Sequence, residues 1–221
     1  MVTPVRIGVL GATGPAGSGL AARLAASGHG VIIGSRSEDR AVEVRDGLVA
    51  KWPDHDLHID AGDNETAAQA DTVVIATPWD AASTTAMSVA HQLRGKVVIC
   101  MANALVRVGT EFQPLVPPRG SVAGNVQAAL PHSFVVAAMQ HIPAKELGDL
   151  PHPVDTDVLV CSDHPSATEL TSELIESMGM RALDAGSLAL ATPIEAFTGV
   201  LLQLNVRYKT RAAVKFTGIS R

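Results

Sequence analysis

The sequence predicts an α/β protein with a doubly wound parallel sheet in its first part and a smaller α/β portion after it. Short β-branched apolar runs alternate with helix-like stretches, which is typical of a parallel sheet with right-handed crossovers. The runs are continuously apolar, as expected for strands buried on both faces. Apolar residues make up 47% of the chain and aromatic residues only 3%, so we expect a core of small aliphatic side chains.

The first part of the chain contains the clearest elements. Gly28 follows a helical stretch at the place where a helix carboxyl end favours a left-handed residue. Ser37 is the expected N-cap of the second helix. The expected strands are 5–10, 31–34, 57–60, 72–76 and 96–100, and the expected helices are 15–27, 37–51 and 81–93.

After about Gly109 the pattern loosens, and Pro114, Pro117 and Pro118 indicate a loop. We expect a helix at 121–130, strands at 134–138, 157–161 and 180–182, a helix at 165–177, and a helical region from about Thr192 to the C-terminus. A boundary near residue 130 would divide the chain into a larger unit, 1–130, and a smaller unit, 131–221.

Charge and composition exclude several classes of partner. The 17 basic and 22 acidic residues give a net charge of −5, which provides no basic field for nucleic acid or anionic lipid. Two cysteines are too few for a disulfide framework, so a reducing cytoplasm is expected. No uninterrupted apolar run reaches the roughly 18 residues of a membrane helix, and the first strand starts too early to leave room for a signal peptide. We therefore expect a soluble, cytoplasmic protein.

The glycines after the first strand predict a dinucleotide-binding loop of the Rossmann type. The stretch 11–17 reads Gly-Ala-Thr-Gly-Pro-Ala-Gly. It fits G-x-G-x-x-G with Ala12 in the first place, or G-x-x-G-x-x-G counted from Gly11. A pyrophosphate needs a tight turn, close approach of the backbone and a helix amino terminus. A glycine-rich turn without a ligand is the alternative, but the strand before the loop and the helix after it favour a nucleotide.

The end of the second strand favours NADP over NAD. An NAD enzyme usually has a carboxylate there for the ribose hydroxyls, whereas this chain has Ser35 and Arg36. The guanidinium of Arg36 suits a 2′-phosphate, Ser35 has a hydroxyl to donate, and Arg40 lies one helical turn further on. Glu38 and Asp39 fit as complements to the helix dipole. The alternative is that Arg36 is an ordinary solvated arginine.

Two further strand ends should lie at the same edge of the sheet, where ligands bind. The fourth strand ends in Ala76-Thr77-Pro78-Trp79 and the fifth in Cys100-Met101-Ala102-Asn103. Trp79 is expected either to form a wall of the nicotinamide pocket or to cover the start of a helix. Cys100 has no base partner in the sequence, so we interpret it as a small buried residue.

The chain resembles the NADPH-dependent reductases of the deazaflavin coenzyme F420, the F420H2:NADP oxidoreductase family. The matching residues are Gly-x-Thr-Gly-x-x-Gly at 11–17, Gly-His at 28–29, Ile-Gly-Ser-Arg at 33–36, Pro-Trp at 78–79, His-Ile-Pro-Ala at 141–144 and Leu-Asp-Ala-Gly-Ser-Leu at 183–188. The resemblance spans nearly the whole chain. Its first half is shared with other Rossmann enzymes, whereas the blocks at 141–144 and 183–188 are more specific.

The resemblance implies a homodimer with an NADP-binding domain, 1–130, and a smaller C-terminal part, 131–221, that closes the substrate site. It also implies two sets of binding residues. The set for NADP(H) comprises Thr13, Gly14, Pro15, Ala16, Ser35, Arg36, Arg40, Ala76, Thr77, Pro78, Trp79, Met101, Ala102, Asn103 and Ala144. The set for the co-substrate F420 comprises His141, Ile142, Pro143, Leu204 and Asn205.

The implied reaction is direct hydride transfer between C4 of the nicotinamide and C5 of the deazaflavin. The two cofactors supply the chemistry, so we expect no catalytic acid or base and no metal. His141 is expected either to bond the substrate ring or to be structural. The basic residues Arg207, Lys209, Arg211, Lys215 and Arg221 would attract the anionic tail of F420, cap a helix or contact a dimer mate.

Two other functions remain open from the sequence. One is another NADP-dependent reductase of a small imine or ketone, although only about 90 residues follow the Rossmann part, fewer than the usual helical second domain of such enzymes. The other is a non-catalytic module that binds NADPH.

Overall fold

The computed structural model describes residues 4–219. Two features considered above, the first residues of the chain and Arg221, lie outside this range. Eight strands form one sheet in the order β10-β9-β8-β5-β4-β1-β2-β3. Their bounds are β1 (Arg6–Leu10), β2 (Gly30–Ser35), β3 (Ile59–Asp63), β4 (Thr72–Ile75), β5 (Val97–Cys100), β8 (Phe134–Ala137), β9 (Asp157–Ser162) and β10 (Arg181–Gly186).

The strand order is that of a doubly wound fold, and it confirms the predicted α/β class. Strands β3, β2, β1, β4, β5 and β8 are parallel neighbours. Strand β9 then runs antiparallel to β8, and β10 is parallel to β9. Only two residue pairs join β8 to β9, Val136 with Ser162 and Ala137 with Cys161. The sheet is continuous across residue 130, so the division into 1–130 and 131–221 stays a prediction.

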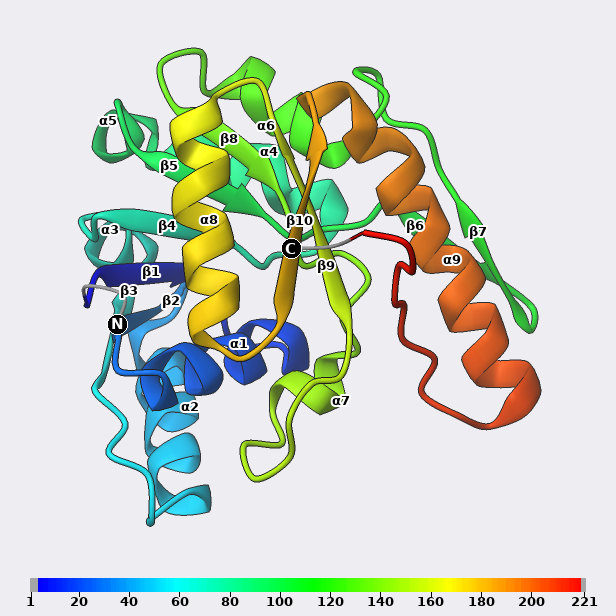
Figure 1. Cartoon of the computed structure of the whole chain (residues 1–221). Coiled ribbons are helices and arrows are strands. Elements are labelled where there is room, and N and C mark those ends of the chain that lie inside the picture. The colour runs from blue at the N-terminus through cyan, green and yellow to red at the C-terminus, as the bar shows by residue number, and fades with distance from the viewer. Residues whose placement is uncertain (1–3, 220–221) are drawn as a thin grey trace.

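Helices cover both faces of this sheet (Figure 1). One apolar cluster packs α1 (Pro15–Ala26), α2 (Glu38–Lys51) and α8 (Pro165–Ser177) against one face. A second cluster packs α3 (Asn64–Ala67), α4 (Trp79–Ser88), α5 (Ala90–Leu93), α6 (Val122–Ala129), the 3₁₀ turn η1 (Leu188–Leu190) and the start of α9 (Ala191–Tyr208) against the other. The buried side chains are mostly Ala, Val, Ile and Leu, as the composition predicts.

Several local predictions are confirmed. Gly28 ends the α1 region with φ +90°, and the side chain of Ser37 caps α2 by accepting from the main-chain N of Arg40. Pro165 and Ser177 bound α8 as expected. The predicted helix at 81–93 is two helices, α4 and α5, because Val89 leaves the helical conformation between them.

Five short elements were missed by the sequence analysis: α3, α7 (Ala144–Leu147), the turn η1 and the hairpin of β6 (Leu105–Val108) and β7 (Glu111–Pro114). The prediction that the chain stays helical to its C-terminus is wrong. Helix α9 ends at Tyr208, and Lys209 adopts the left-handed conformation with φ +51°.

Residues 209–219, here called the C-terminal strap, return from the end of α9 to β9 and β10 (Figure 1). The main-chain N of Asp157 donates to the carbonyl of Val214 at 2.8 Å. The carboxylate of Asp157 accepts from the main-chain N of Phe216 at 2.7 Å and pairs with Arg181. Because Arg181 and Phe216 hold this carboxylate as its anion, the pKa of Asp157 is lowered.

The stretch Leu188–Tyr208, which includes α9, is long and apolar enough to cross a membrane by length and composition alone. Polar residues such as Glu195 and Gln203 interrupt it. Helix α9 contacts β7 of the hairpin and α6, so one side of it is packed against protein.

Candidate functional site

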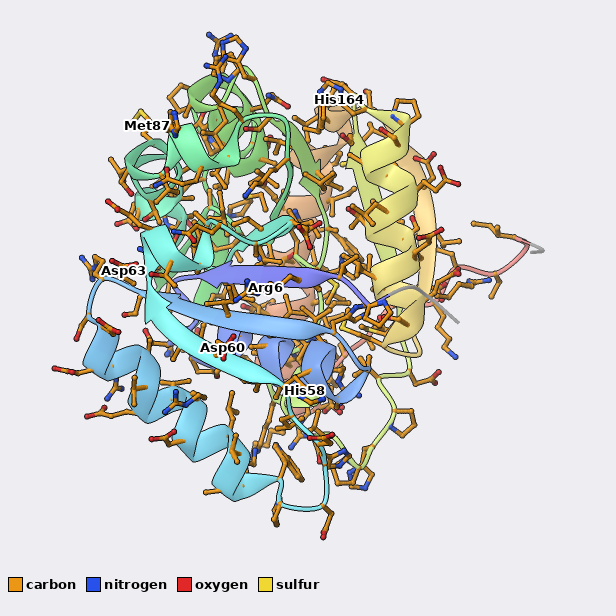
Figure 2. All side chains as sticks on the ribbon, turned by 90° about the vertical axis from the view of Figure 1, so that its left-hand side faces the viewer. Arg6, His58, Asp60, Asp63, Met87 and His164 are labelled. Carbon is orange, nitrogen blue, oxygen red and sulfur yellow. The ribbon has the colours of Figure 1, made fainter. Side chains whose placement is uncertain are left out.

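A cleft of about 820 Å³ lies at the carboxyl edge of the parallel strands. Figure 2 shows this edge from the side of β3, where Asp63 at the end of β3 and Met87 of α4 lie on the same side of the molecule. The cleft is lined by the turn between β1 and α1, the ends of β2 and β4, and one face of α4. These residues are Gly11, Thr13, Gly14, Pro15, Ala16, Gly17, Ser35, Arg36, Asn64, Ala76, Thr77, Pro78, Ala81, Thr84, Thr85 and Ser88.

The turn after β1 is held by main-chain bonds and by Gly11. The amides of Gly11 and Ala12 donate to the carbonyl of Gly34 at 3.0 and 3.2 Å. Gly11 has φ +72°, and a Cβ there would lie 2.4 Å from Cγ2 of Thr77. Ala12 is fully buried. Gly11 therefore makes the tight turn, and alanine is accommodated at residue 12 because that residue needs no left-handed conformation.

The amino terminus of α1 points its amides at the cleft. Gly14 is the N-cap and provides no side-chain cap, Pro15 takes the first helical position, and the first turn holds no acidic residue. The first amides of a helix have no partner within the helix, and the helix dipole adds positive potential there. A Cβ on Gly17 would lie 2.8 Å from Cα of Ala12, so this glycine allows the close packing of α1. The arrangement suits an anion such as a pyrophosphate.

The end of β2 provides the positive charge of the cleft. Ser35 is buried and accepts from the main-chain N of Ser37 at 3.3 Å. Arg36 is exposed, and it is the one charged residue among the described residues that line the cleft. Arg40 does not line the cleft; its guanidinium pairs with Glu43 at 3.0 Å. No carboxylate lies among the lining residues described, so the cleft has the electrostatics that a phosphorylated ribose requires.

The exit of β4 contributes Ala76, Thr77 and Pro78 as predicted. Trp79 is the first residue of α4, is 36% exposed and does not line the cleft. The sequence analysis missed Asn64 and the face of α4 formed by Ala81, Thr84, Thr85 and Ser88. The spacing of the α4 residues, three, four and seven apart, was the available signal for a shared helix face.

Other predicted residues lie beside the cleft rather than on its walls. Met101 and Ala102 are buried at the end of β5, and the side-chain amide of Asn103 donates to the carbonyl of Gln140 at 2.9 Å. Pro143 caps α7 and Ala144 begins it. Helix α7 packs on α1, where a Cβ on Gly19 would come 3.2 Å from the carbonyl oxygen of Ala144.

His141 is buried, and its Nε2 lies 2.9 Å from the carbonyl oxygen of Asp157. A carbonyl accepts, so we assign the proton to Nε2, which leaves Nδ1 buried without a partner in the described chain. Burial lowers the pKa of His141 and keeps it neutral. Ile142 beside it is buried as well. Leu204 and Asn205 lie on α9, where the side-chain oxygen of Asn205 accepts from the main-chain N of Ala212.

Both cysteines are buried thiols. Cys100 and Cys161 are free and buried, and burial raises the pKa of each thiol to about 12. The interpretation of Cys100 as a buried small residue is confirmed. Within residues 4–219, no group of three or more His, Cys, Asp or Glu side chains could hold a metal ion.

Comparison with known proteins agrees with this geometry. Residues 6–104 match the family described as NADP oxidoreductase, coenzyme F420-dependent. The F420-dependent NADP reductase of Methanocaldococcus jannaschii is 35% identical over 94% of this chain and 95% of its own length. The enzyme of the same name from Methanothermobacter marburgensis is 36% identical over 97% of this chain and 99% of its own length.

A crystal structure from Arthrobacter sp. FB24, described as a candidate F420-dependent NADP reductase, superposes with a TM-score of 0.79. It is 26% identical and the match covers 94% of this chain and 96% of that one. The near-full coverage of the curated relatives extends the likeness beyond the cleft to β8, β9, β10 and α9. On these matches, the chain belongs to the family of coenzyme F420-dependent NADP oxidoreductases.

Proposed function

We propose that this protein is an oxidoreductase that transfers hydride between NADP(H) and the deazaflavin coenzyme F420. The observation that carries the NADP half is the cleft itself. An uncapped helix amino terminus and a lone arginine face a space without carboxylates among its described walls. The F420 half rests on the relatives named above, which match the chain over nearly its whole length.

The protein's residues act on the dinucleotide by binding and orientation. The backbone of residues 13–16 holds the pyrophosphate, with the amides of Thr13, Gly14 and Ala16 as donors because Pro15 has no N–H. Ser35 and Arg36 hold the 2′-phosphate. Arg40 joins them if its guanidinium leaves Glu43, an exposed pair of small energy. Residues 76–79, 101–103 and Ala144 are proposed to contact the nicotinamide half, and of these Ala76, Thr77 and Pro78 line the cleft directly.

The bound NADP(H) and F420 supply the hydride chemistry, between C4 of the nicotinamide and C5 of the deazaflavin. The chain therefore needs no acid or base for the hydride step. Its contribution is to stack the two rings, fix their separation and keep water out. His141, Ile142, Pro143, Leu204 and Asn205 are proposed to border the deazaflavin.

The basic residues near the C-terminus attract the anionic tail of F420 in this proposal. Arg211 pairs with Glu146 at 2.7 Å, and Lys215 pairs with Asp155. Both of these cations already have carboxylate partners. Arg207 and Lys209 are therefore the better candidates for the tail.

We also propose that the protein is a cytoplasmic homodimer that joins through α9 and the β6–β7 hairpin. One face of α9 exposes Phe197, Val200, Leu204 and Tyr208, which are spaced three and four residues apart, by 37 to 67%. A groove of about 400 Å³ runs between this face and the hairpin. Contiguous exposed apolar side chains of this kind are typical of subunit interfaces.

Val200→Glu tests the dimer. It places a charge on the exposed face, so light scattering should give the monomer mass for the variant and twice that mass for the wild type. A wild type that is monomeric at micromolar concentration would refute the proposed interface.

One assay tests the activity. Protein, NADPH and oxidised F420 are mixed, and the deazaflavin absorbance is followed. The proposal predicts bleaching that saturates with NADPH. Retained NADPH binding without bleaching would refute it, and would favour either an NADP-dependent reductase of an imine or ketone or a non-catalytic NADPH-binding module.

A further inference from the structure

A buried turn with a strained backbone joins β8 to α7. Met139 is 3% exposed and adopts φ +72°, a conformation that side chains with a Cβ rarely take. Gln140, which follows it, is 4% exposed. Strained residues of this kind persist only where their surroundings hold them, and they cluster at functional sites.

Gln140 makes contacts in two directions. Its side-chain Nε2 donates to the carbonyl of Cys100, at the end of β5, at 2.9 Å. Its own carbonyl accepts from Nδ2 of Asn103 at 2.9 Å and from the hydroxyl of Thr198 on α9 at 3.2 Å. One residue thus ties together the exit of β5, the exit of β8 and helix α9.

Stability alone does not account for a glutamine here. Its Oε1 is buried without a hydrogen-bond partner among the described residues, and so is Oδ1 of Asn103. An apolar side chain of similar volume would avoid an unpaired buried oxygen. Such an apolar side chain would lack the bond from Nε2 to the carbonyl of Cys100, through which the side chain of Gln140 links this turn to β5.

We propose that Gln140 is a positioning residue for hydride transfer, which fixes the separation between residues 101–103 on one side and residues 141–143 with α9 on the other. The inference rests on the proposed function, because these two segments are the ones assigned above to the nicotinamide and to the deazaflavin. Gln140 acts through the carbonyl of Cys100 and the side chains of Asn103 and Thr198, and it touches neither ring. A displacement of about 1 Å between reacting groups costs on the order of 100-fold in rate, so this bond should affect the transfer rate more than cofactor affinity.

Gln140→Leu is the first test. The variant should slow single-turnover hydride transfer from NADPH to F420 by about 10- to 100-fold. The Kd for NADPH should change less than about threefold, because none of the residues assigned to the pyrophosphate and the 2′-phosphate is a hydrogen-bond partner of Gln140. In steady state the loss should appear in kcat rather than in KM for NADPH.

Gln127→Leu is the matched control. Gln127 also bridges main-chain groups, since its side chain bonds Leu130, Ser133 and Val135 at 3.0 to 3.2 Å, but at the amino end of β8. It should lower the melting temperature at least as much as Gln140→Leu and leave the transfer rate at the wild-type value. Rate loss in Gln140→Leu no greater than in Gln127→Leu would overturn the proposal.

Gln140→Glu tests the donor itself and decides the matter if Gln140→Leu does not fold. A carboxylate cannot donate to the carbonyl of Cys100, whereas a protonated carboxyl can. Burial raises the pKa of a carboxyl at this position, so the transfer rate relative to wild type should recover about tenfold as the pH falls from about 8 to about 5.5. The wild type and the Gln140→Glu variant both contain Glu195 and His141. Dividing the transfer rate of the variant by that of the wild type at each pH therefore cancels the effect of these two groups. A ratio that does not change with pH would overturn the proposal.

The wild type separates this inference from the proposed function. If wild-type protein does not bleach F420, the proposed function fails. If the wild type is active and Gln140→Leu is equally active, only the positioning role fails.

Discussion

Replacing Gly14 by alanine should leave the fold intact and weaken NADPH binding. A Cβ at Gly14 would meet no atom within 4 Å, and its φ of −88° and ψ of 164° are open to alanine. Losing glycine as an N-cap costs a few tenths of a kcal/mol to about 1 kcal/mol, and the smaller unfolded-state entropy of alanine returns about 0.4 to 1 kcal/mol. The free energy of unfolding should therefore change by less than about 1 kcal/mol.

Gly14 lines the cleft, and in the proposed placement the pyrophosphate must approach its backbone closely. The added methyl group should hinder that approach. Losing one amide bond to a charged oxygen costs about 1.5 to 3 kcal/mol, which corresponds to a rise in Kd of about 10- to 150-fold. Isothermal titration with NADPH, together with urea unfolding of the free protein, measures both quantities.

Gly11→Ala is the control with the opposite expectation for stability. Its φ of +72° costs alanine about 1 to 2 kcal/mol, and its Cβ would lie 2.4 Å from Cγ2 and 3.1 Å from Cα of Thr77. Overpacking adds about 1 to 3 kcal/mol to this cost. Gly11→Ala should therefore unfold at a clearly lower urea concentration than the wild type. Wild-type NADPH affinity in Gly14→Ala would refute the placement of the pyrophosphate at residues 13–16.

Three further predictions test other parts of the structure. Arg36→Glu should weaken NADPH binding by about 10-fold or more and leave NADH binding nearly unchanged; equal losses in parallel titrations would contradict a 2′-phosphate role. Burial raises the pKa of Glu195 from 4.5 to about 7, so the native protein holds this proton more tightly than the unfolded chain. The free energy of unfolding of the wild type should therefore fall by on the order of 3 kcal/mol because of this group as the pH rises from about 4.5 to about 7. In urea unfolding, Glu195→Gln should show a smaller fall over the same pH range. An equal fall in both proteins would argue against the raised pKa of Glu195. Arg23→Met removes the donor to the carbonyls of Glu146, Leu147, Asp149 and His152; it should cost about 2 to 4 kcal/mol and make 146–152 the first segment cut in limited proteolysis, which an unchanged digestion pattern would contradict.

The elements that could be predicted are those with a local cause. Helix α2 begins where Ser37 accepts from the backbone, and α8 begins with Pro165 and is followed by Gly179 at φ +81°. Helices α3 and α7 have four residues each, too few to show a helical period. The reversed direction of β9 depends on how the segment after β8 packs, since strand patterns carry no direction.

The candidate site divides in the same way. The turn at 11–17 and the lack of a carboxylate at Ser35–Arg36 are local, and the cleft contains them as predicted. Asn64 lines the same cleft only because α3 packs against the backbone of β1 and β2. The pairing of Arg40 with Glu43, three residues further along α2, was visible in the sequence as a helix-face spacing.

The two-pair junction between β8 and β9 leaves residues 157–160 of β9, about 13 Å of strand, beyond the end of β8. Overhanging strand edges recruit other chains, because their main-chain groups remain open to pairing. The C-terminal strap meets this overhang through the bonds of Asp157 to Val214 and Phe216. We therefore expect the strap to keep the amino end of this strand edge from pairing with another chain, and variants that loosen it should self-associate through β9.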